Sequence, residues 1–292
     1  MNIAFCANKL ALVGLGVTVV SLLRNCTDTG KLNIWFLCQD FSIKEKTKIK
    51  QLLQFENYAG KYYFIDFNPS STFRTFPSLH GDWMPYGRLL LADLIEEESV
   101  LYLDADLVVE LDVAELESFL LNDYILAAVR GGRFRDTLGQ KFYREELGIC
   151  ADTDYFNSGV LLLNLEQWRI QKFKEKCLRL GALYQNDLPS HDQSLLNILL
   201  QGDFAKLPPY FNCEWLPQQP KPTVSERMIL HFTGSPKPWD PLGSYIHNGY
   251  KTWKKYSTDF TEDLDSFSLK NIQRVWNIRR SYIRSIKRRI SS

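Results

Sequence analysis

Several features are missing from this chain of 292 residues, and each absence narrows its class. Its six cysteines include no Cys-x-x-Cys motif and no paired spacing, so the sequence predicts neither a zinc site nor a disulfide scaffold. It also contains no internal repeat and no low-complexity segment. We therefore expect a cytoplasmic globular protein with reduced thiols, whose 45% hydrophobic residues are enough for a substantial core.

The chain also lacks a hydrophobic run that would comfortably cross a bilayer. The one candidate, residues 10–23, follows a predicted strand over residues 3–7 and is preceded by only Lys9 as a positive charge. A signal peptide would begin with a more basic segment. We therefore predict a buried helix that ends near Asn25.

Acidic residues are absent after Asp265, although the whole chain has a formal charge of only +1. Eight of the 35 basic residues lie beyond this point, which leaves 27 basic residues against 34 acidic ones in the body. A negatively charged body makes nucleic acid a poor candidate as partner. The basic residues of the tail are Lys270, Arg274, Arg279, Arg280, Arg284, Lys287, Arg288 and Arg289.

Apolar runs alternate with segments of helical periodicity through most of the chain. This alternation predicts an α/β fold with a largely parallel sheet, helices on both faces and ligands at the carboxyl ends of the strands. The proline-rich stretch 207–222 is interpreted as a loop that crosses the surface. We predict strands over residues 3–7, 32–38, 61–66, 100–103, 124–129 and 159–163, and helices over residues 44–55, 86–95, 113–121 and 193–201.

The most informative segment is the hydrophobic strand from Val100 to Leu103, which ends at Asp104 and Asp106. Two carboxylates at the end of a buried strand need a positive partner, and a divalent cation that holds a phosphate suits their oxygen ligands. Alternation along a strand would send both side chains to the same side. The alternative is a solvated acidic turn that caps the next helix.

A second polar cluster follows the short apolar run 228–230. It combines His231, Gly234 and Lys237 within seven positions, which are the parts of a diphosphate site with a third metal ligand. The alternative is a loop histidine with a solvated lysine. The earlier acids Asp104 and Asp106 favour the diphosphate site.

Three more polar residues lie next to predicted elements. Asn157 precedes a buried strand and is interpreted either as a polar group in a cleft or as part of a simple turn. At a predicted helix start, Ser190 or Asp192 is available to cap exposed amides. Arg88 opens a helix ahead of the acid-bearing strand, where it either meets substrate or makes an ion pair.

Together these motifs resemble family 8 of the retaining glycosyltransferases, over residues 1 to about 250. This family includes bacterial lipopolysaccharide galactosyl- and glucosyltransferases and the glycogenins. The resemblance rests on the ordered set Tyr86-x-Arg88, Leu101-Tyr102-Leu103-Asp104-x-Asp106, Phe156-Asn157-x-Gly159, His191-Asp192-Gln193 and His231-x-x-Gly234-x-x-Lys237.

The resemblance implies a Rossmann-like GT-A fold and transfer of galactose or glucose from a UDP-sugar to a surface-glycan, lipopolysaccharide or glycoprotein acceptor. It implies one catalytic domain over residues 1–265, with a nucleotide-sugar half to about residue 110 and an acceptor and donor-sugar half after it. The implied cofactor is manganese, with magnesium as the second choice. By this analogy the metal ligands are Asp104, Asp106 and His231. The nucleotide contacts are Ala7, Asn8, Asp104, Ala105, Asp106, Gly234 and Lys237. The donor sugar is surrounded by Arg88, Asn157, Asp192 and Gln193, of which Asp192 and Gln193 are the catalytic residues that the analogy implies.

The chemistry of glycosyl transfer agrees with such a site. Breaking a glycosyl phosphate bond builds negative charge on the departing diphosphate, which a metal ion and Lys237 would stabilise. A covalent route to retention needs a nucleophile, and the amide of Gln193 is a poor one. We therefore expect the acceptor to attack on the face that the leaving group vacates, with the donor phosphate accepting its proton and Gln193 stabilising the oxocarbenium-like state.

The chain departs from the family pattern in two places. Family members commonly have Ala-x-Asp and an Asn-Tyr pair after the first strand, whereas this chain has Ala7 and Asn8 with no tyrosine, so an aromatic partner for the base is missing. Asn8 can still form a hydrogen bond with a base. Arg130 and Arg133 occur where relatives often have an acid near the acceptor, which predicts a negatively charged acceptor.

The tail, residues 266–292, is predicted to form a basic amphipathic helix on an anionic cytoplasmic leaflet, with Trp276 and Tyr282 at the headgroup level. The alternatives are a helix docked on the acidic body and a disordered tail. Under the membrane interpretation, deletion after Asp265 should release the protein from anionic vesicles and spare hydrolysis of a soluble donor. The apolar residues expected near one face are Val275, Trp276, Ile283, Ile286 and Ile290.

Two other classes of protein are alternatives. A phosphatase of the haloacid dehalogenase type would use Asp104 as nucleophile and Asp106 as acid and base, but it leaves His231 and Lys237 unexplained. A catalytically degenerate, transferase-like binding protein is favoured by Asn8 and the absent tyrosine. Manganese-dependent consumption of a nucleotide sugar distinguishes the three classes.

Overall fold

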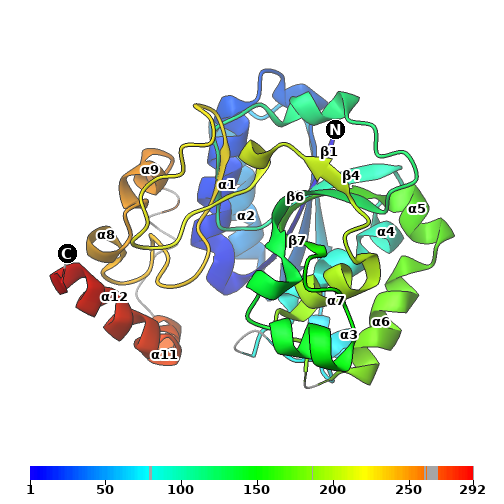
Figure 1. Cartoon of the computed structure of the whole chain (residues 1–292). Coiled ribbons are helices and arrows are strands. Elements are labelled where there is room, and N and C mark those ends of the chain that lie inside the picture. Colours follow the sequence, from blue (N-terminus) through cyan, green and yellow to red (C-terminus); the bar gives the residue numbers. More distant parts are fainter. Residues whose placement is uncertain (79–80, 186, 260, 262–268, 292) are drawn as a thin grey trace.

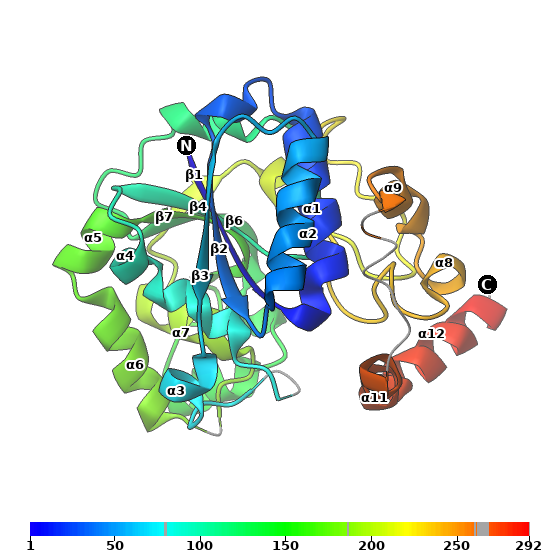
Figure 2. The same ribbon diagram turned by 180° about the vertical axis from the view of Figure 1, so that it is seen from behind.

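A mostly parallel sheet forms the middle layer of the structure, with helices on both faces (Figures 1 and 2). The computed structural model describes residues 1–78, 81–185, 187–259, 261 and 269–291. Within these ranges, seven strands pair in the order β3-β2-β1-β4-β7-β6-β8, and β7 runs antiparallel to both of its neighbours. Their bounds are β1 Asn2–Asn8, β2 Asn33–Gln39, β3 Lys61–Asp66, β4 Ser99–Leu103, β6 Leu126–Arg133, β7 Asp154–Asn164 and β8 Ala205–Leu207.

This arrangement confirms the predicted α/β fold, and all six predicted strands are present. Strand β4 is buried on both faces, as its apolar run indicates: Leu101 and Leu103 contribute to one hydrophobic core, and Val100 and Tyr102 contribute to the other. A second, three-stranded sheet was not predicted, because its strands are too short to show a clear pattern. It has the order β5-β10-β9, with β5 Leu107–Val109, β9 Cys213–Glu214 and β10 Ile229–His231.

The helices separate into two layers. The helices α1 and α2 cover one face of the main sheet, and α4 to α7 cover the other (Figures 1 and 2). The prediction of a buried helix near residues 10–23 is confirmed by α1, in which every residue from Leu12 to Leu23 is buried. The helices of the body are α1 Leu12–Asn25, α2 Ile43–Phe55, α3 Pro69–Phe73, α4 Leu91–Leu94, α5 Leu165–Ile170, α6 Phe173–Leu183, α7 His191–Leu200, α8 Gly243–Ile246 and α9 Tyr250–Lys255.

Two polar residues of α1 hold the strand that follows the acid pair. Thr18 Oγ1 donates a hydrogen bond to the carbonyl of Leu107 at 2.9 Å and accepts its N–H at 3.0 Å. Ser21 Oγ accepts the N–H of Val109 at 2.9 Å. These bonds satisfy the buried polar groups of β5 and fix the position of the preceding residues.

Three predicted elements differ from the structure. The predicted helices 86–95 and 113–121 are largely 3₁₀ helices, Met84–Leu90 and Val113–Ser118, since apolar periodicity over two turns does not distinguish the two helix types. The proline-rich stretch is not a plain surface loop. It contains β9, which pairs with β10 and carries the buried residues Cys213 and Trp215 to the core.

The tail packs against the body as two helices, α11 Leu269–Asn277 and α12 Arg279–Ser291, which gather with α8 and α9 at one flank (Figure 1). Ile278 lies between them and forms a small apolar cluster with Ile246 and Tyr282. The prediction that Tyr282 lies at a membrane surface is wrong, because it is 7% exposed and donates a hydrogen bond to the carbonyl of Pro241. The docked alternative is the arrangement observed.

The predicted domain boundary at Asp265 lies outside the described residues. The side chain of Ile290, expected on the apolar face of the tail, also lies outside them. Among the helices that the structure describes, none combines the length and apolar composition needed to span a bilayer.

Candidate active site

The candidate site lies where the order of the parallel strands reverses. Strands β2 and β3 follow β1 on one side, whereas β4 pairs with β1 on the other side. Such a reversal leaves a crevice at the carboxyl ends of the strands, where α/β proteins bind ligands. Asn8 ends β1 and Asp104 follows β4, so both lie at this edge.

Asp104 and Asp106 converge as predicted, but for a different reason. They lie on the link between β4 and β5, which belong to different sheets, so strand alternation does not orient them. The backbone N–H of Asp104 is held by the carbonyl of Gly159 at 2.8 Å. Its Oδ1 accepts hydrogen bonds from Tyr102 at 2.7 Å and from Arg88 at 3.0 Å, which leaves Oδ2 toward His231.

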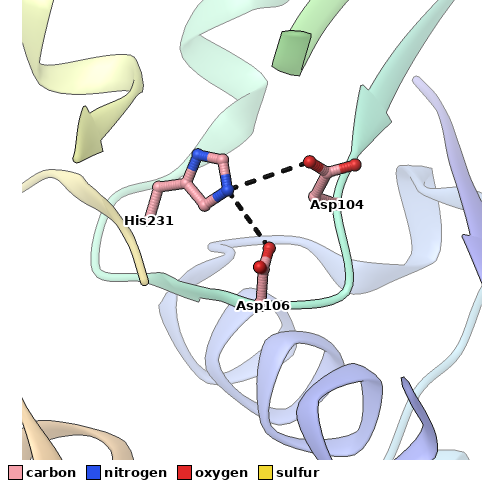
Figure 3. Close-up of side chains that lie close together, drawn as sticks. All are labelled: Asp104, Asp106 and His231. Carbon is pink, nitrogen blue, oxygen red and sulfur yellow. Dashed lines mark ion pairs between the residues drawn. The ribbon is translucent and has the colours of Figure 1, made fainter. Parts of the chain in front are cut away.

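His231 completes the cluster from the end of β10 (Figure 3). Its Nε2 lies 3.2 Å from Asp106 Oδ1 and 3.8 Å from Asp104 Oδ2. Its Nδ1 lies 3.0 Å from Asn212 Oδ1, which cannot donate, so Nδ1 carries the proton. The lone pair of a neutral His231 therefore lies on Nε2, which is directed at the carboxylates.

These three residues fit a divalent cation. One ligand atom from each of Asp104, Asp106 and His231 lies within 4.8 Å of the others. Asp106 Oδ1 is buried and has no hydrogen-bond partner among the described residues, which is costly unless a cation binds it. Carboxylate oxygens with an imidazole nitrogen suit manganese and also accept magnesium.

Gly159 of β7 leaves the space that this cluster occupies. A Cβ atom at this position would lie 2.2 Å from His231 Cε1 and 2.9 Å from Asp104 Oδ2. No side chain can be accommodated there unless His231 moves away from the carboxylates. Glycine is therefore required at residue 159 by the cluster itself.

Lys237 brings a positive charge to the same place. Its Nζ lies 2.6 Å from Asp106 Oδ2 and also contacts the carbonyl of Phe232. Burial raises the pKa of Asp106, but the positive charge of Lys237, together with His231 when its ring is protonated, outweighs burial and holds that pKa below its usual range. Gly234 in the same loop has a φ of 74°, and a Cβ there would lie 2.9 Å from Leu216 Cδ2.

Arg88 is buried and bridges two acids. Its Nη2 lies 3.0 Å from Asp104 Oδ1 and its Nε lies 3.0 Å from Asp192 Oδ2. Of the two interpretations of Arg88, the ion pair is therefore present, and contact with substrate stays a prediction. Burial raises the pKa of Asp192 despite the nearby guanidinium. The side chain of Ser190, the N-cap residue of α7, makes no capping hydrogen bond.

Gln193 and Asn157 are both held by hydrogen bonds. The carbonyl oxygen of Gln193 accepts the N–H of Ser158 at 3.0 Å, and its amide nitrogen donates to Tyr155 Oη at 3.1 Å. Asn157 Oδ1 accepts the N–H of Gly159 at 2.8 Å and an N–H of the Asn212 side chain at 3.1 Å. Asn157 is therefore connected through Asn212 to His231.

Sequence reasoning missed Asn212, Ser158, Tyr155 and Asp82. Asn212 lies in the stretch interpreted as a surface loop, and nothing in its surroundings marks it as a partner of His231. Asp82 accepts a hydrogen bond from Asn8 Nδ2 at 2.7 Å. The side-chain oxygen of Asn8 accepts the N–H groups of Leu10 and Ala11. Since one amide hydrogen of Asn8 is donated to Asp82, only its second amide hydrogen has no partner among the described residues.

The alanines assigned to the nucleotide lie beside these groups. Ala7 precedes Asn8 at the end of β1, and Ala105 lies between the two acids of the link. The roles of both stay predictions. Arg130 forms an ion pair with Asp154 at 2.7 Å and Arg133 forms one with Asp152 at 2.8 Å, and the negatively charged acceptor stays a prediction.

The fold and the site define an α/β domain with an Asp-Asp-His cluster that could hold a cation at the carboxyl ends of its strands, and with a lysine beside that cluster. The family model for "Glycosyl transferase family 8" matches residues 2–243. The chain belongs to this family, as its motifs predict. The phosphatase alternative is thereby set aside.

The chain is similar to several bacterial proteins. It is 26% identical over 282 residues to "General stress protein A" of Bacillus subtilis, covering 88% of this chain and 95% of the relative. It is 26% identical over 263 residues to "Lipopolysaccharide 1,2-glucosyltransferase" of Escherichia coli, covering 84% and 74%. Its match to a probable glycosyl transferase of Streptococcus gordonii, at 28% identity, covers 64% of this chain and 26% of that longer protein.

Solved structures show the same fold. The galactosyltransferase LgtC, solved with donor and acceptor sugar analogues, superposes with a TM-score of 0.74 at 24% identity. The match covers 92% of this chain and 98% of that one. This likeness shows that the chain has the GT-A fold.

Proposed function

We propose that this protein is a retaining hexosyltransferase that uses a UDP-sugar, with manganese or secondly magnesium held by Asp104, Asp106 and His231. The observation that carries the proposal is the convergence of these three side chains beside the ammonium of Lys237. Two carboxylates and an imidazole suit a divalent cation, and a lysine next to that cation suits the diphosphate of a nucleotide sugar. When bound, the cation acts as a Lewis acid on the departing diphosphate.

The residues of the chain have separate roles in this proposal. Lys237 shifts from Asp106 to the diphosphate and stabilises the charge that develops there. Gln193 lies with both ends of its amide hydrogen-bonded, so its orientation is fixed before the donor binds. An amide is a poor nucleophile, which supports attack by the acceptor on the vacated face, with the acceptor proton passing to the donor phosphate.

We place the acceptor in a cavity of about 260 Å³ next to this network. Arg130, Asn157, Asn212 and Glu214 are among its lining residues. These side chains include a cation, an anion and two neutral amides, so they offer both hydrogen-bond donors and acceptors. Such a mixture suits the hydroxyl groups of a glycan better than a strongly anionic group. A surface glycan or lipopolysaccharide is the first class to test, with lipid-linked and protein acceptors next.

We also propose that the outward face of the tail meets an anionic membrane surface. Ile272 and Trp276 of α11 and Ile283 of α12 are 51%, 66% and 54% exposed, so both helices of the tail present large apolar side chains to solvent. The guanidinium of Arg279 lies over the Trp276 ring, 4.6 Å from its centroid, and adds positive charge to this face. Replacing Trp276 by Ser should weaken sedimentation with anionic vesicles and leave weak binding to neutral vesicles unchanged; equal binding of both variants to anionic vesicles contradicts this proposal.

The central test is a panel of UDP-, GDP- and dTDP-sugars, measured by thermal shift and by nucleotide release with manganese or with a chelator. We expect a UDP-hexose to raise the melting temperature most and to be hydrolysed slowly, both only with the metal. Release of phosphate from simple monoesters would instead revive the phosphatase alternative. If a nucleotide sugar bound in the presence of the metal but was neither hydrolysed nor transferred to any acceptor, the protein would be a degenerate binding protein.

A further inference from the structure

Asp240 is a buried carboxylate whose partners come from two distant parts of the chain. Its side chain is 3% exposed. It accepts the backbone N–H of Lys237 at 2.7 Å, and it accepts Nε and Nη2 of Arg274 at 2.6 and 2.9 Å. A buried carboxylate is destabilising unless donors and an opposite charge compensate it. Arg274 supplies that charge from α11.

The segment that carries Asp240 has little regular structure of its own. Between Lys237 and Ile246 it contains turns and the single helical turn α8. The tail covers this segment: Tyr282 donates a hydrogen bond to the carbonyl of Pro241 at 2.8 Å, and Ile278 packs on Ile246. Figure 1 shows α11 and α12 next to α8 at this flank.

The same segment places Lys237 at the site. A lysine has a flexible four-carbon stem, so the position of its ammonium depends on where its backbone is anchored. The anchor here is Asp240, which holds the N–H of Lys237, while Nζ reaches Asp106 at 2.6 Å. Contacts therefore run without interruption from Arg274 through Asp240 and Lys237 to Asp106.

A cavity gives a second connection between the tail and this loop. It has a volume of about 350 Å³ and is lined by Gly234 and Ser235 of the loop together with Ser281 and Arg284 of α12. Gln218, another lining residue, donates a hydrogen bond to the carbonyl of Ser285. The tail thus borders the loop at Gly234 and Ser235 through this cavity and reaches Lys237 through Asp240.

We propose that Arg274 is a positioning residue for the donor diphosphate. By holding Asp240 it fixes the backbone of Lys237, so the tail is part of the donor site as well as a surface element. This inference rests on the proposed function, in which Lys237 binds the diphosphate. It also means that deletion after residue 265 weakens donor binding, in contrast to the expectation from sequence that donor hydrolysis is spared.

A merely structural ion pair would behave differently. It would lower the stability of the fold when broken and leave the affinity for the donor nucleotide unchanged. The chain offers a matched control in Arg24, which makes an equivalent bidentate pair with Glu56 at 2.7 and 2.8 Å, at the end of α1 remote from the site. The exposed fractions also match, at 39% and 7% for this pair against 34% and 3% for Arg274 and Asp240.

The experiment compares Arg274→Gln with Arg24→Gln in the full chain, by calorimetric titration with manganese and UDP. We expect the dissociation constant of the manganese–UDP complex to rise about tenfold in Arg274→Gln and to stay within about twofold in Arg24→Gln. Arg274→Lys keeps the charge but not the bidentate geometry, so it should restore part of the affinity. It also serves as the second variant if Arg274→Gln fails to fold.

A double-mutant cycle tests whether Arg274 acts through Lys237. If it does, Arg274→Gln should have almost no further effect on UDP affinity in a Lys237→Gln background. Additive losses in the cycle would overturn the inference, as would equal affinities of Arg274→Gln and Arg24→Gln.

Amide hydrogen exchange provides a readout that needs no ligand. Arg274→Gln should speed exchange of the Lys237 amide and its neighbours up to residue 246, whereas Arg24→Gln should not. Unchanged exchange there would refute the positioning role. If the wild-type chain bound no manganese–UDP, the proposed function would fail, and faster exchange in Arg274→Gln would still show that the tail positions this loop.

Discussion

Two regions of the protein direct side chains at the same place, and they are stabilised in different ways. The strand-end region, residues 99–109 and 154–164, is built on β4 and β7, which pair in register from Ser99 with Asn164 to Leu103 with Val160. Its core residues are fully buried. In the carboxyl-terminal region, residues 229–259 and 269–287, the short strand β10 and α9 join the main core. The segment from Lys237 to Ile246 and the tail are instead held by Asp240, Arg274 and a small apolar cluster.

This difference determines what each region is sensitive to. Asp104 and Asp106 lie on a short link whose two ends are fixed by β4 and β5, and these strands are buried in the hydrophobic cores, so the backbone there changes little with solution conditions. Lys237 is positioned by paired charges and a small apolar cluster, whose strength depends on protonation and on what the tail contacts. Asp104 and Asp106 are therefore the rigid part of the candidate site, and Lys237 is the adjustable part.

The largest expected effect comes from Asp106, where the two regions meet. Asp106→Asn removes a carboxylate ligand of the expected cation and the partner of Lys237, so we expect manganese-dependent turnover of the donor to fall by at least about 100-fold. Manganese affinity measured by titration should fall as well. Asp93→Asn is the control, because Asp93 pairs with Lys174 at 2.7 Å on the surface, and turnover should stay within about twofold. Undiminished metal binding by Asp106→Asn would remove Asp106 from the ligand set.

Core truncations should separate the two regions by stability. Leu101→Ala, at a residue with no exposed surface, should lower the free energy of unfolding by about 2–5 kcal/mol. Ile278→Ala, at a residue 6% exposed in the small cluster of the tail, should lower it by less, about 2 kcal/mol, because fewer buried side chains surround it. Urea unfolding measures both. Equal losses would mean that the carboxyl-terminal region is as firmly packed as the strand-end region.

Acid should affect the carboxyl-terminal region first. Burial, aided by Lys237, lowers the pKa of His247 from 6.5 to about 4, so the unfolded chain takes up a proton before the folded one does. The free energy of unfolding should therefore fall as pH drops from about 6.5 to 4. His247→Gln keeps a hydrogen-bond acceptor for Gly249 and should remove this dependence.

Glu45 defines a second, lower pH window on the amino-terminal side. Its ion pair with Lys9 and its capping bonds with Ser42 lower its pKa from 4.5 to about 2. The stability that it contributes is present above pH 4.5 and is lost as pH falls toward 2. In Glu45→Gln, the free energy of unfolding measured with urea should no longer fall between pH 4.5 and 2, but should still fall between about pH 6.5 and 4. If the fall between pH 6.5 and 4 also disappeared in this variant, the assignment of that fall to His247 would be contradicted.

The smallest expected effect concerns Asn8, which is predicted to contact the base of the donor nucleotide. Asp82→Ala removes the partner of Asn8 Nδ2, so the loop at the end of β1 is held less firmly. We expect the donor KM to rise about three- to tenfold with little change in kcat, because the diphosphate contacts remain. Asp82→Asn retains an acceptor for Asn8 and should be milder. A loss confined to kcat would show that Asp82 acts elsewhere.

The sequence predicted the strand-end region well and the carboxyl-terminal region poorly. Long apolar runs such as Val100 to Leu103 are buried on both faces, and their alternation with helices limits the fold to few arrangements. The ordered motifs also indicated Asp104, Asp106 and His231, which the structure brings together. Asn212 and Asp240 were not found, because a single polar residue in a loop gives no sign of its partner.

The tail shows most clearly where such reasoning stops. The sequence predicted one amphipathic helix, but the structure turns at Ile278 and divides the apolar residues between two faces. Val275 and Ile286 pack toward the body, whereas Trp276 and Ile283 are exposed. Helical periodicity does not indicate that Ile278, at this break, packs against Ile246, a residue distant in the chain.

The sequence by itself determined the α/β architecture, the family and the identity of the ligands that converge. These follow from local patterns, since burial of strands and the chemistry of carboxylates and imidazoles depend on the residues themselves. The tertiary structure alone decided that Asn212 orients His231, that Gly159 leaves room for the cluster, and that Arg274 of the tail holds Asp240 beneath Lys237. Each of these depends on contacts between segments far apart in the chain, which no local pattern records.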